Sequence, residues 1–381
     1  MNINEQVEQA VQAFRGLLEE QLARAERMAH AAKPVDWTQT PHIVIGICPG
    51  DGIGPIIMRE AGRVMQSMLA EDIASGRIEL RYIDGLTIEN REACGKAIPD
   101  DVLAAIKACD VVLKGPTTTP KGGTLESANV AMRRELDLFA NVRPVVVPQE
   151  GIDWTFFREN TEGEYVLGSR GVEIEGQLAM DFKVTTDLGT KRIARAAFEY
   201  ARRNGKTNVA IVTKANIMKK TDGKFSALCH EIAAEYPDIV AEDYYIDIMT
   251  ANLVNPRTRN KYQVFVLPNL YGDIITDEAA QIQGGVGTAG SANLGDRYAM
   301  FEAIHGSGLR MMEEGRGEYA NPSSVLKAAA MLMRHIGYAD KADRLEAALI
   351  TCNETERRLV MTGNASGATC TQFADYVIEK L

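Results

Sequence analysis

This chain of 381 residues lacks the features of several protein classes. No stretch approaches the roughly 18 consecutive apolar residues that a membrane helix needs, so no membrane partner is expected. Acidic residues exceed basic ones by 52 to 42, for a net charge of −10, whereas nucleic-acid-binding proteins usually carry a basic face. We therefore expect no nucleic-acid partner. The six cysteines form no CxxC pair, which argues against a disulfide scaffold or zinc ribbon and indicates a reduced, cytoplasmic setting.

Residues 1–33 predict one amphipathic helix without the apolar core of a secretion signal. Its many glutamates also argue against a mitochondrial transit peptide. The apolar positions recur at spacings of three and four; they are Val7, Val11, Phe14, Leu18 and Leu22. This pattern is typical either of a solvated leader or of a helix docked on its own subunit or on a partner. No catalytic motif lies in it, and we predict a helical extension over residues 1–40.

From residue 43 onward, apolar strand patterns alternate with helical patterns. Strands are expected over residues 43–48, 110–114, 209–212 and 264–267, and helices over residues 56–69, 323–336 and 341–351. Such alternation is typical of an α/β fold with a largely parallel sheet. The loop after the first strand is glycine-rich, but the dinucleotide fingerprint GxGxxG is absent. No linear boundary is visible, so any second domain is expected as an insertion in the first.

Three arginines lie near small hydroxyl and amide side chains. The hydroxyl and amide residues are Thr118, Thr119, Ser127 and Asn129, and the arginines are Arg133, Arg143 and Arg158. Because a guanidinium binds a carboxylate through two hydrogen bonds, this set indicates a polycarboxylate site. The alternative is a set of surface ion pairs with Glu135, Asp137 and Glu159.

Acidic residues follow the strand at residues 264–267. Asp273 and Asp277 are four residues apart, so on a helix both carboxylates share one face. Such oxygen ligands suit Mg²⁺ or Mn²⁺, although an exposed helix face explains the spacing equally well. Asp247 is a third acid in an apolar setting. Lys214 follows another strand and could act as a base if its pKa is lowered.

Six segments occur in the order seen in the β-decarboxylating dehydrogenases, and the chain resembles this family. The segments are PGDGIGP, GGTLESANVAMRRELDLFANVRP, FRENTEGEY, TKANIMKKTDG, LPNLYGDIITDEAAQIQGGVGTAGSANLG and FEAIHGSGLR with ANPSS. The family contains isocitrate, isopropylmalate, homoisocitrate and tartrate dehydrogenases, and the resemblance covers residues 43–381. It implies a large α/β domain of residues 41–138 and 284–381, with a smaller α/β domain of residues 139–283 inserted in it.

The resemblance implies a role for each matched residue. Tyr165 protonates the enolate that is left after CO₂ departs, and Lys214 takes the proton of the substrate hydroxyl. The remaining implied roles are substrate binding by Ser127, Asn129, Arg133, Arg143 and Arg158; metal binding by Asp247, Asp273 and Asp277; and cofactor binding by Thr118, Thr119, Glu302, His305, Gly306, Arg310 and Asn321. In the family, Lys214 and Asp247 act in the neighbouring subunit's site. A homodimer with shared sites, possibly within a higher oligomer, is therefore expected.

The implied reaction is metal-dependent oxidation of a 2-hydroxy acid by NAD⁺ or NADP⁺, with loss of CO₂. Isopropylmalate enzymes carry apolar side chains where this chain has Ser127 and Asn129, whose polar groups suit the third carboxylate of isocitrate. We expect conversion of isocitrate to 2-oxoglutarate, with homoisocitrate, tartrate or isopropylmalate as alternative substrates. A non-catalytic regulatory subunit is a further alternative. Arg310 favours NADP⁺, but Met311 replaces the tyrosine common in NADP⁺ enzymes, so the cofactor is left open.

Overall fold

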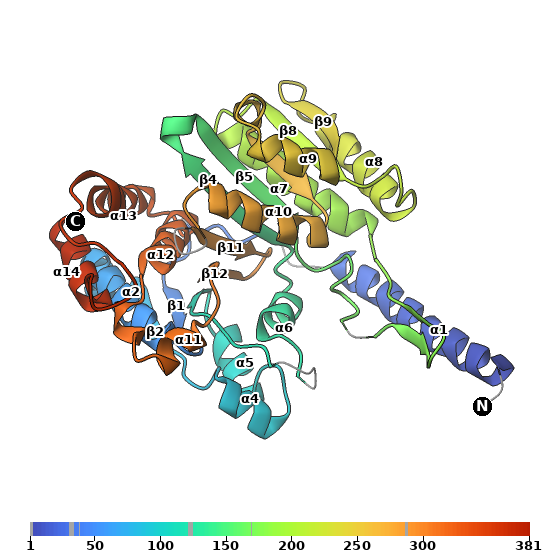
Figure 1. The fold of residues 1–381 in the computed structure, drawn as a ribbon, viewed down its shortest axis with the longest axis horizontal. Coiled ribbons are helices and arrows are strands. Elements are labelled where there is room, and N and C mark those ends of the chain that lie inside the picture. Colours follow the sequence, from blue (N-terminus) through green and yellow to red (C-terminus); the bar gives the residue numbers. More distant parts are fainter. Residues whose placement is uncertain (1–2, 30–33, 38, 121–124, 169, 286–288) are drawn as a thin grey trace. The chain divides into compact units, whose positions relative to one another are not determined.

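The computed structural model describes residues 3–29, 34–37, 39–120, 125–168, 170–285 and 289–381, and both of its parts have the predicted α/β architecture (Figure 1). The chain divides into two compact units. Unit 1 comprises Met1–Lys33, Phe139–Asn141 and Pro148–Thr276, and unit 2 comprises Pro34–Leu138, Val142–Val147 and Asp277–Leu381.

The units and the predicted domains differ in four places. Residues 1–33 group with unit 1, whereas residues 34–40, 142–147 and 277–283 group with unit 2. The predicted limits, with residues 139–283 as an inserted domain, stay a prediction.

The sheet of unit 2 is mostly parallel, in the order β2–β1–β3–β12–β11–β4. Its strands are β1 (Ile43–Cys48), β2 (Ile78–Tyr82), β3 (Val111–Lys114), β4 (Ala140–Val147, with residues 142–147 in this unit), β11 (Gly290–Leu294) and β12 (Ala299–Ala303). The pair β11–β12 is antiparallel. Only residues 295–298 join these two strands, and a parallel connection would need a dozen residues or more.

Helices cover this sheet on both faces. They are α2 (Gly54–Met68), α3 (Ala70–Ala74), α4 (Ile88–Cys94), α5 (Asp100–Lys107), α6 (Ala128–Glu135), α11 (Leu309–Glu313), α12 (Ser323–His335), α13 (Ala339–Ile350) and α14 (Cys370–Glu379). A buried apolar cluster joins α5 and α6 to the strands and includes Ile106, Met132 and Val112. Helix α12 approaches β11 so closely that a Cβ on Gly290 would lie 2.6 Å from the backbone nitrogen of Ala328.

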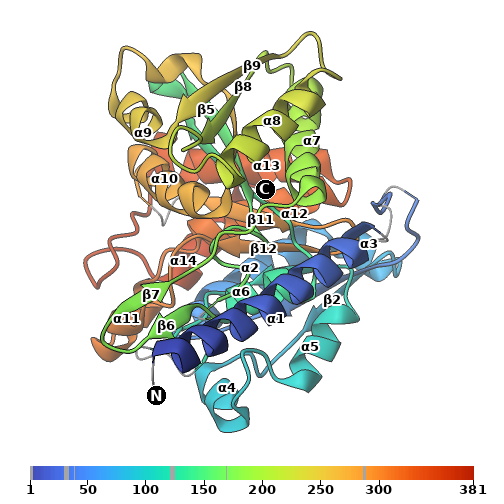
Figure 2. The same ribbon diagram turned by 90° about the vertical axis from the view of Figure 1, so that its right-hand side faces the viewer.

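In unit 1, four strands pair in the order β5–β10–β8–β9, and all of them run parallel. The elements of this unit are β5 (Ile152–Glu159), β8 (Asn208–Thr213), β9 (Val240–Tyr245), β10 (Val264–Leu267), α7 (Asp187–Arg203), α8 (Thr221–Ala233), α9 (Ile246–Val254), α10 (Asn269–Ile282, with residues 269–276 in this unit) and the hairpin β6 (Val172–Ile174) with β7 (Leu178–Met180). Helices α7 and α8 lie on one face and α9 and α10 on the other (Figures 1 and 2). The core includes Trp154 and the stacked rings of Phe156 and Phe265, with centroids 4.3 Å apart.

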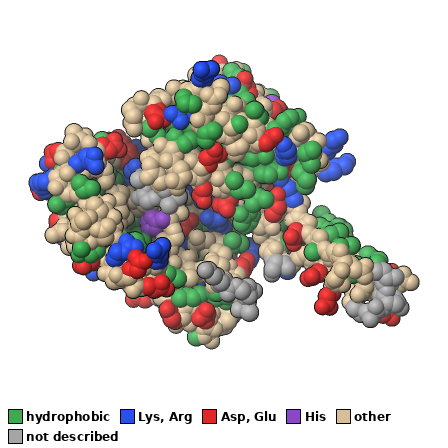
Figure 3. Space-filling view, in the orientation of Figure 1, with side chains coloured by type: hydrophobic (Ala, Val, Ile, Leu, Met, Phe, Trp, Pro, Cys, Tyr) green, Lys and Arg blue, Asp and Glu red, His purple; other side chains and the backbone are tan. Residues whose placement is uncertain are grey.

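The N-terminal helix α1 (Ile3–Ala29) lies along the β6–β7 hairpin of unit 1 (Figure 2). Gln21 and Met28 are buried, and the ring of Phe14 lies 5.1 Å from that of Phe182, between centroids. Of the two predicted alternatives, the helix is therefore docked on its own chain; residues 30–33 lie outside the described residues. Its apolar stripe nevertheless stays exposed and includes Val11, Leu18 and Leu22 (Figure 3).

An indole–imidazole pair joins the start of unit 2 to α12. The Nε1 atom of Trp37 donates to Nε2 of His335 over 3.0 Å, and the imidazole also lies against the ring of Phe301. Burial lowers the pKa of His335 from 6.5 to about 4, because the charged form loses its hydration. Protonation would also remove the acceptor that Trp37 uses.

We therefore expect acid to destabilise unit 2 through His335. The folded state binds this proton less readily than the unfolded state, so stability falls as pH drops from 6.5 towards 4 and this loss ends below pH 4. The loss should reach about 3 kcal/mol. His335→Gln keeps a hydrogen-bond acceptor but does not titrate. The variant should therefore show a weaker dependence of the unfolding free energy on pH, measured by urea unfolding at pH 7, 6, 5 and 4. Equal slopes for the two proteins would contradict the assignment to His335.

Candidate functional site

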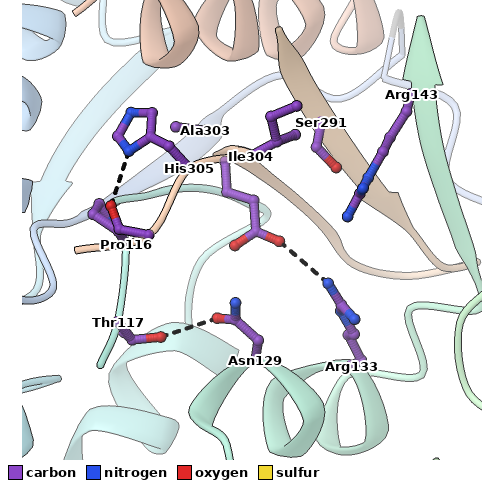
Figure 4. A pocket seen from close by; sticks show the side chains of 11 residues that line it. Pro116, Thr117, Asn129, Arg133, Arg143, Ser291, Ala303, Ile304 and His305 are labelled. Carbon is purple, nitrogen blue, oxygen red and sulfur yellow. Dashed lines mark hydrogen bonds and ion pairs between the residues drawn. The ribbon is translucent and has the colours of Figure 1, made fainter. Parts of the chain in front are cut away.

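A polar cavity of about 150 Å³ lies in unit 2, at the carboxyl ends of the parallel strands β3 and β12 (Figure 4). Its lining is Pro116, Thr117, Asn129, Arg133, Arg143, Ser291, Glu302, Ala303, Ile304, His305 and Gly306. Six predicted site residues are thus brought together: Asn129, Arg133, Arg143, Glu302, His305 and Gly306. Ser127 precedes α6 and does not line this cavity within the described part of the chain.

The amide of Asn129 and two arginines give the cavity its chemistry. The hydroxyl of Thr117 donates to Oδ1 of Asn129 over 3.1 Å, which leaves the amide nitrogen pointing into the cavity (Figure 4). Arg133 comes from α6 and Arg143 from β4. Both are largely buried, so they present positive charge where few water molecules screen it.

Glu302 is a buried carboxylate held by cations. Lys114 pairs with its Oε2 at 3.1 Å, Asn293 donates to its Oε1 over 2.8 Å, and Arg133 lies 3.7 Å away. Burial alone would raise the pKa of Glu302, but Lys114 and Arg133 outweigh it and lower the pKa to about 2. Glu302 is therefore ionised and consumes part of the positive charge of Arg133. Lys114, the last residue of β3, was not indicated by any sequence pattern.

The loops around the cavity are fixed by Asp51, a further residue that sequence reasoning missed. Its carboxylate accepts from the backbone nitrogens of Thr118 and Ile88, over 2.7 and 2.8 Å. The hydroxyl of Thr118 donates to that of Ser307 over 2.8 Å, and Thr119 is exposed. Asp51 lies in the glycine-rich turn GDG, and an acid at that position was the sequence feature that could have identified it.

The residues of unit 2 fit one end of a dinucleotide. Nδ1 of His305 lies 3.0 Å from the carbonyl oxygen of Gly306, while its buried Nε2 has no hydrogen-bond partner among the described residues. Burial lowers the pKa of His305, so the ring is neutral and Nε2 suits a polar ligand group. A cavity of about 150 Å³ holds a molecule of roughly benzene's size, not a whole dinucleotide. It therefore suits the substrate or the reactive ring of the cofactor.

The two remaining predicted cofactor residues lie further along the same loop. The side-chain Oδ1 of Asn321 accepts from the backbone nitrogen of Ser323 over 2.9 Å at the start of α12. Arg310 on α11 is 86% exposed, and its Nε donates to Glu314 over 2.7 Å. Glu314 also pairs with Arg316. The charge of Arg310 is thus shared with a neighbouring carboxylate.

A second group of predicted residues meets in unit 1. Arg158 is the last but one residue of β5, opposite Leu267 of β10, and α10 follows β10. The guanidinium of Arg158 is buried; its Nε and Nη2 donate to Oδ1 of Asn269 over 2.9 and 2.7 Å, and Nη1 pairs with Asp273. The hydroxyl of Tyr165 donates to the other oxygen of Asp273 over 2.8 Å. One carboxylate therefore joins the predicted substrate arginine to the predicted catalytic tyrosine.

Lys214 and Asp247 form a separate pair after β8 and β9, with Nζ and Oδ1 2.6 Å apart. The side chains are 27% and 66% exposed. The hydrogen bond from Lys214 lowers the pKa of Asp247. The backbone nitrogen of Lys214 donates to the buried Asp222, which also pairs with Lys183 over 2.6 Å. Asp222 and Lys183 hold the Lys214 loop, and the sequence had not singled them out.

The predicted metal ligands are carboxylates, which hard cations prefer, but too few of the described ones lie together to form a complete site. Asp273 and Asp277 lie one turn apart on α10, where Asp273 pairs with Arg158, and Asp277 with Arg143 over 3.1 Å. Among the described residues, no group of three or more potential ligands converges. A single chain thus offers oxygen ligands that fit Mg²⁺ or Mn²⁺ without a complete set.

A family model described as isocitrate/isopropylmalate dehydrogenase matches residues 44–377. The chain belongs to this family. The family resemblance inferred from the sequence is thereby confirmed. Helix α1 lies outside the matched range. Among the described helices, none has the length and apolar content needed to cross a membrane.

Relatives within the isocitrate/isopropylmalate dehydrogenase family carry more than one name. An isocitrate dehydrogenase [NADP] of Rickettsia prowazekii is 41% identical over 80% of this chain, which spans 62% of the relative's length. A probable isocitrate dehydrogenase [NAD] subunit alpha of Caenorhabditis elegans is 36% identical over 86% of this chain and 89% of its own. A 3-isopropylmalate dehydrogenase of Archaeoglobus fulgidus is 39% identical over 80% and 90%. The crystal structure of isocitrate dehydrogenase from Methylococcus capsulatus has a TM-score of 0.78 at 35% identity, covering 89% of this chain and 99% of that one.

Proposed function

We propose that this protein catalyses the oxidative decarboxylation of isocitrate to 2-oxoglutarate and CO₂, with NAD⁺ or NADP⁺ and a divalent cation. The observation that carries the proposal is the cavity of unit 2, where Arg133 and Arg143 face the amide of Asn129. Isocitrate has three carboxylates, and two buried guanidiniums with an amide donor match such a polyanion. Relatives named as isocitrate dehydrogenases support the same substrate.

In the proposed reaction, unit 1 supplies a third guanidinium and both proton-transfer groups. Arg158 binds a substrate carboxylate and is held by Asn269 and Asp273. Lys214 removes the hydroxyl proton of the substrate, and Tyr165 returns a proton to carbon after CO₂ has left.

The cofactor and cation have defined binding residues in this proposal. Asp273 and Asp277, with Asp247 of a second copy, hold the cation, which when bound lowers the pKa of the substrate hydroxyl and polarises the carbonyl that replaces it. His305, Gly306 and Asn321 would hold the dinucleotide, with Thr118, Thr119, Glu302 and Arg310 nearby, and its nicotinamide would supply the acceptor for the hydride. The preference between NAD⁺ and NADP⁺ stays open, because Arg310 shares its charge with Glu314.

We also propose a homodimer in which Lys214 and Asp247 serve the site of the second copy. Apolar side chains beside this pair are exposed to an unusual extent: Ile217 66%, Tyr245 45%, Ile248 49% and Val254 54%. Exposed apolar surface of this kind is typical of protein interfaces. Contact with a second copy would bury this apolar surface and place Lys214 and Asp247 next to the site of the second copy.

The decisive experiment measures NAD⁺ and NADP⁺ reduction with isocitrate, homoisocitrate, isopropylmalate and tartrate, with Mg²⁺ and after chelation. We expect isocitrate to have the highest kcat/KM and chelation to abolish turnover. A higher kcat/KM for isopropylmalate would favour the activity named in the relative from Archaeoglobus fulgidus. Absence of turnover with all four acids would refute the proposed function.

Ser127→Leu with Asn129→Leu is expected to abolish isocitrate turnover while the protein stays folded. Each lost hydrogen bond to a charged group costs about 1.5–3 kcal/mol, so kcat/KM should fall by about tenfold or more per bond. Asn129 lines the cavity and Ser127 does not, so Asn129→Leu alone should cause most of the loss. Ser127→Leu is the matched control. Unchanged kcat/KM in the double variant, with unaltered circular dichroism, would show that neither side chain recognises the substrate.

A further inference from the structure

Glu162 is a buried carboxylate in the segment that links Arg158 to Tyr165. Its side chain is 3% exposed and accepts from the backbone nitrogen of Thr186, over 2.9 Å, and from the hydroxyl of the same residue. A Cβ on Gly189 would lie only 2.4 Å from Oε1, so the carboxylate fits closely against the first turn of α7. The family chemistry described above assigns this residue no role.

The cation that neutralises Glu162 comes from the N-terminal helix. Nη1 of Arg24 lies 3.1 Å from Oε1 of Glu162, and Nη2 donates to the hydroxyl of Thr161 over 3.2 Å. Arg24 is 15% exposed, so this pair is far less screened by water than an ordinary surface pair. Helix α1 thus reaches into the family's own segment, although it lies outside the family match.

A second buried acid, Glu159, adds to the negative charge in the turn that Arg24 contacts. Glu159 is buried, and its carboxylate accepts from the backbone nitrogens of Thr161 and Glu162 and from the Thr161 hydroxyl. Burial, and then the charge of Glu162, raise the pKa of Glu159 to about 7. Arg192 also donates to the Thr161 hydroxyl, over 3.1 Å. Two carboxylates and two guanidiniums therefore fix the backbone of this turn.

Hydrogen bonds continue from this turn to the proposed catalytic groups. Nδ2 of Asn269 donates to the backbone carbonyl of Glu162 over 3.0 Å, and Oδ1 of Asn269 accepts twice from Arg158. Arg158 pairs with Asp273, which accepts from Tyr165. The position of the Glu162 carbonyl thus sets the orientation of Asn269, and Asn269 orients Arg158.

We propose that Arg24 is a positioning residue, through which the N-terminal helix holds the 158–165 segment so that Arg158 and Tyr165 are aligned for the substrate. The inference rests on the proposed function. It assigns to α1 a task in catalysis that its sequence did not indicate. The helix thereby becomes part of the substrate side of the site without touching the substrate.

The test compares Arg24→Ala with Arg27→Ala, an exposed arginine one turn later on the same helix, and with Arg24→Lys, which keeps a charge but cannot bridge both partners. We expect Arg24→Ala to raise the isocitrate KM and lower kcat by about tenfold each, because small misplacements of catalytic groups are costly. The KM of the cofactor should not change. Arg24→Lys should recover part of the loss, and Arg27→Ala should match the wild type.

Hydrogen–deuterium exchange of the full-length proteins supplies a readout that does not depend on turnover. Exchange in the peptide spanning residues 159–165 should rise in Arg24→Ala only. Glu20→Ala, which removes the ion pair of α1 with Arg170, should leave both kinetics and this exchange unchanged. Faster exchange with normal kinetics, an equal loss in Glu20→Ala, or a lower kcat with unaltered KM would overturn the inference. An inactive wild type would refute the proposed function as well, whereas an active wild type matched by Arg24→Ala overturns this inference alone.

Discussion

Subunits carrying Lys214→Met and subunits carrying Tyr165→Phe are expected to regain activity when they are mixed. Each variant alone should lose about 10²–10⁴-fold in kcat, because each removes a proton-transfer group. If Lys214 acts in the site of the second copy, a mixed dimer contains one site with both variant residues and one intact site. Random mixing in equal amounts should then restore about a quarter of the wild-type activity.

The control for this complementation is a mixture of Lys214→Met with the double variant Lys214→Met, Tyr165→Phe. No combination of these subunits contains an intact site, so the mixture should stay inactive. Exchange of subunits is verified by native mass spectrometry of an affinity-tagged variant. If mixed dimers form and remain as inactive as either parent, Lys214 acts within its own subunit.

Gly272→Ala is expected to disturb Arg158 without removing any functional group. The added Cβ would lie 2.5 Å from Cγ and 2.7 Å from Cβ of Arg158, so the guanidinium has to move away from Asn269 and Asp273. Overpacking of this kind costs about 1–3 kcal/mol. We expect the isocitrate KM to rise about tenfold or more, since 1.4 kcal/mol corresponds to a factor of ten.

The matched control is Gly223→Ala, also in a helix, where no atom lies within 4 Å of the new Cβ. That change should leave the kinetics unaltered and stabilise the protein by about 0.5–1 kcal/mol, the usual gain from replacing a helical glycine. Thermal unfolding and steady-state kinetics of both variants provide the comparison. A normal KM in Gly272→Ala would show that Arg158 does not bind the substrate.

Local patterns in the sequence predicted the elements but not how they meet. The strand patterns at residues 43–48 and 264–267 match β1 and β10 residue for residue, because short β-branched runs bounded by loops leave little choice. Whether residues 1–33 form a solvated leader or a docked helix could not be predicted, because the helical pattern fits both. The docking depends on contacts with residues more than a hundred positions away in sequence, such as that of Arg24 with Glu162. The order of the strands in the sheets also follows from such long-range pairing, which the periodicity of the sequence does not reveal.

In the candidate site, too, some features were predictable from the sequence and others were visible only in the structure. The residue types that bind carboxylates were visible as Arg133, Arg143 and Arg158, since guanidiniums near amides are recognisable without a structure. Their pairing with Glu302 and Asp273 was not visible, because these acids lie more than a hundred residues away in sequence from Arg133 and Arg158. Lys114 and Asn269 were missed because a lysine ending a strand and an asparagine starting a helix are ordinary in sequence, and only burial reveals their task.

The two tryptophans of this chain lie in different units, Trp154 in the core of unit 1 and Trp37 in unit 2. Each unit therefore carries its own fluorophore. Trp154→Phe leaves an emission signal that reports only on unit 2, and Trp37→Phe leaves one that reports only on unit 1. Unfolding curves of these two single-tryptophan proteins would overlay if the units melt together and would separate if one opens first. The distribution of two indoles thus makes the cooperativity between the units directly observable.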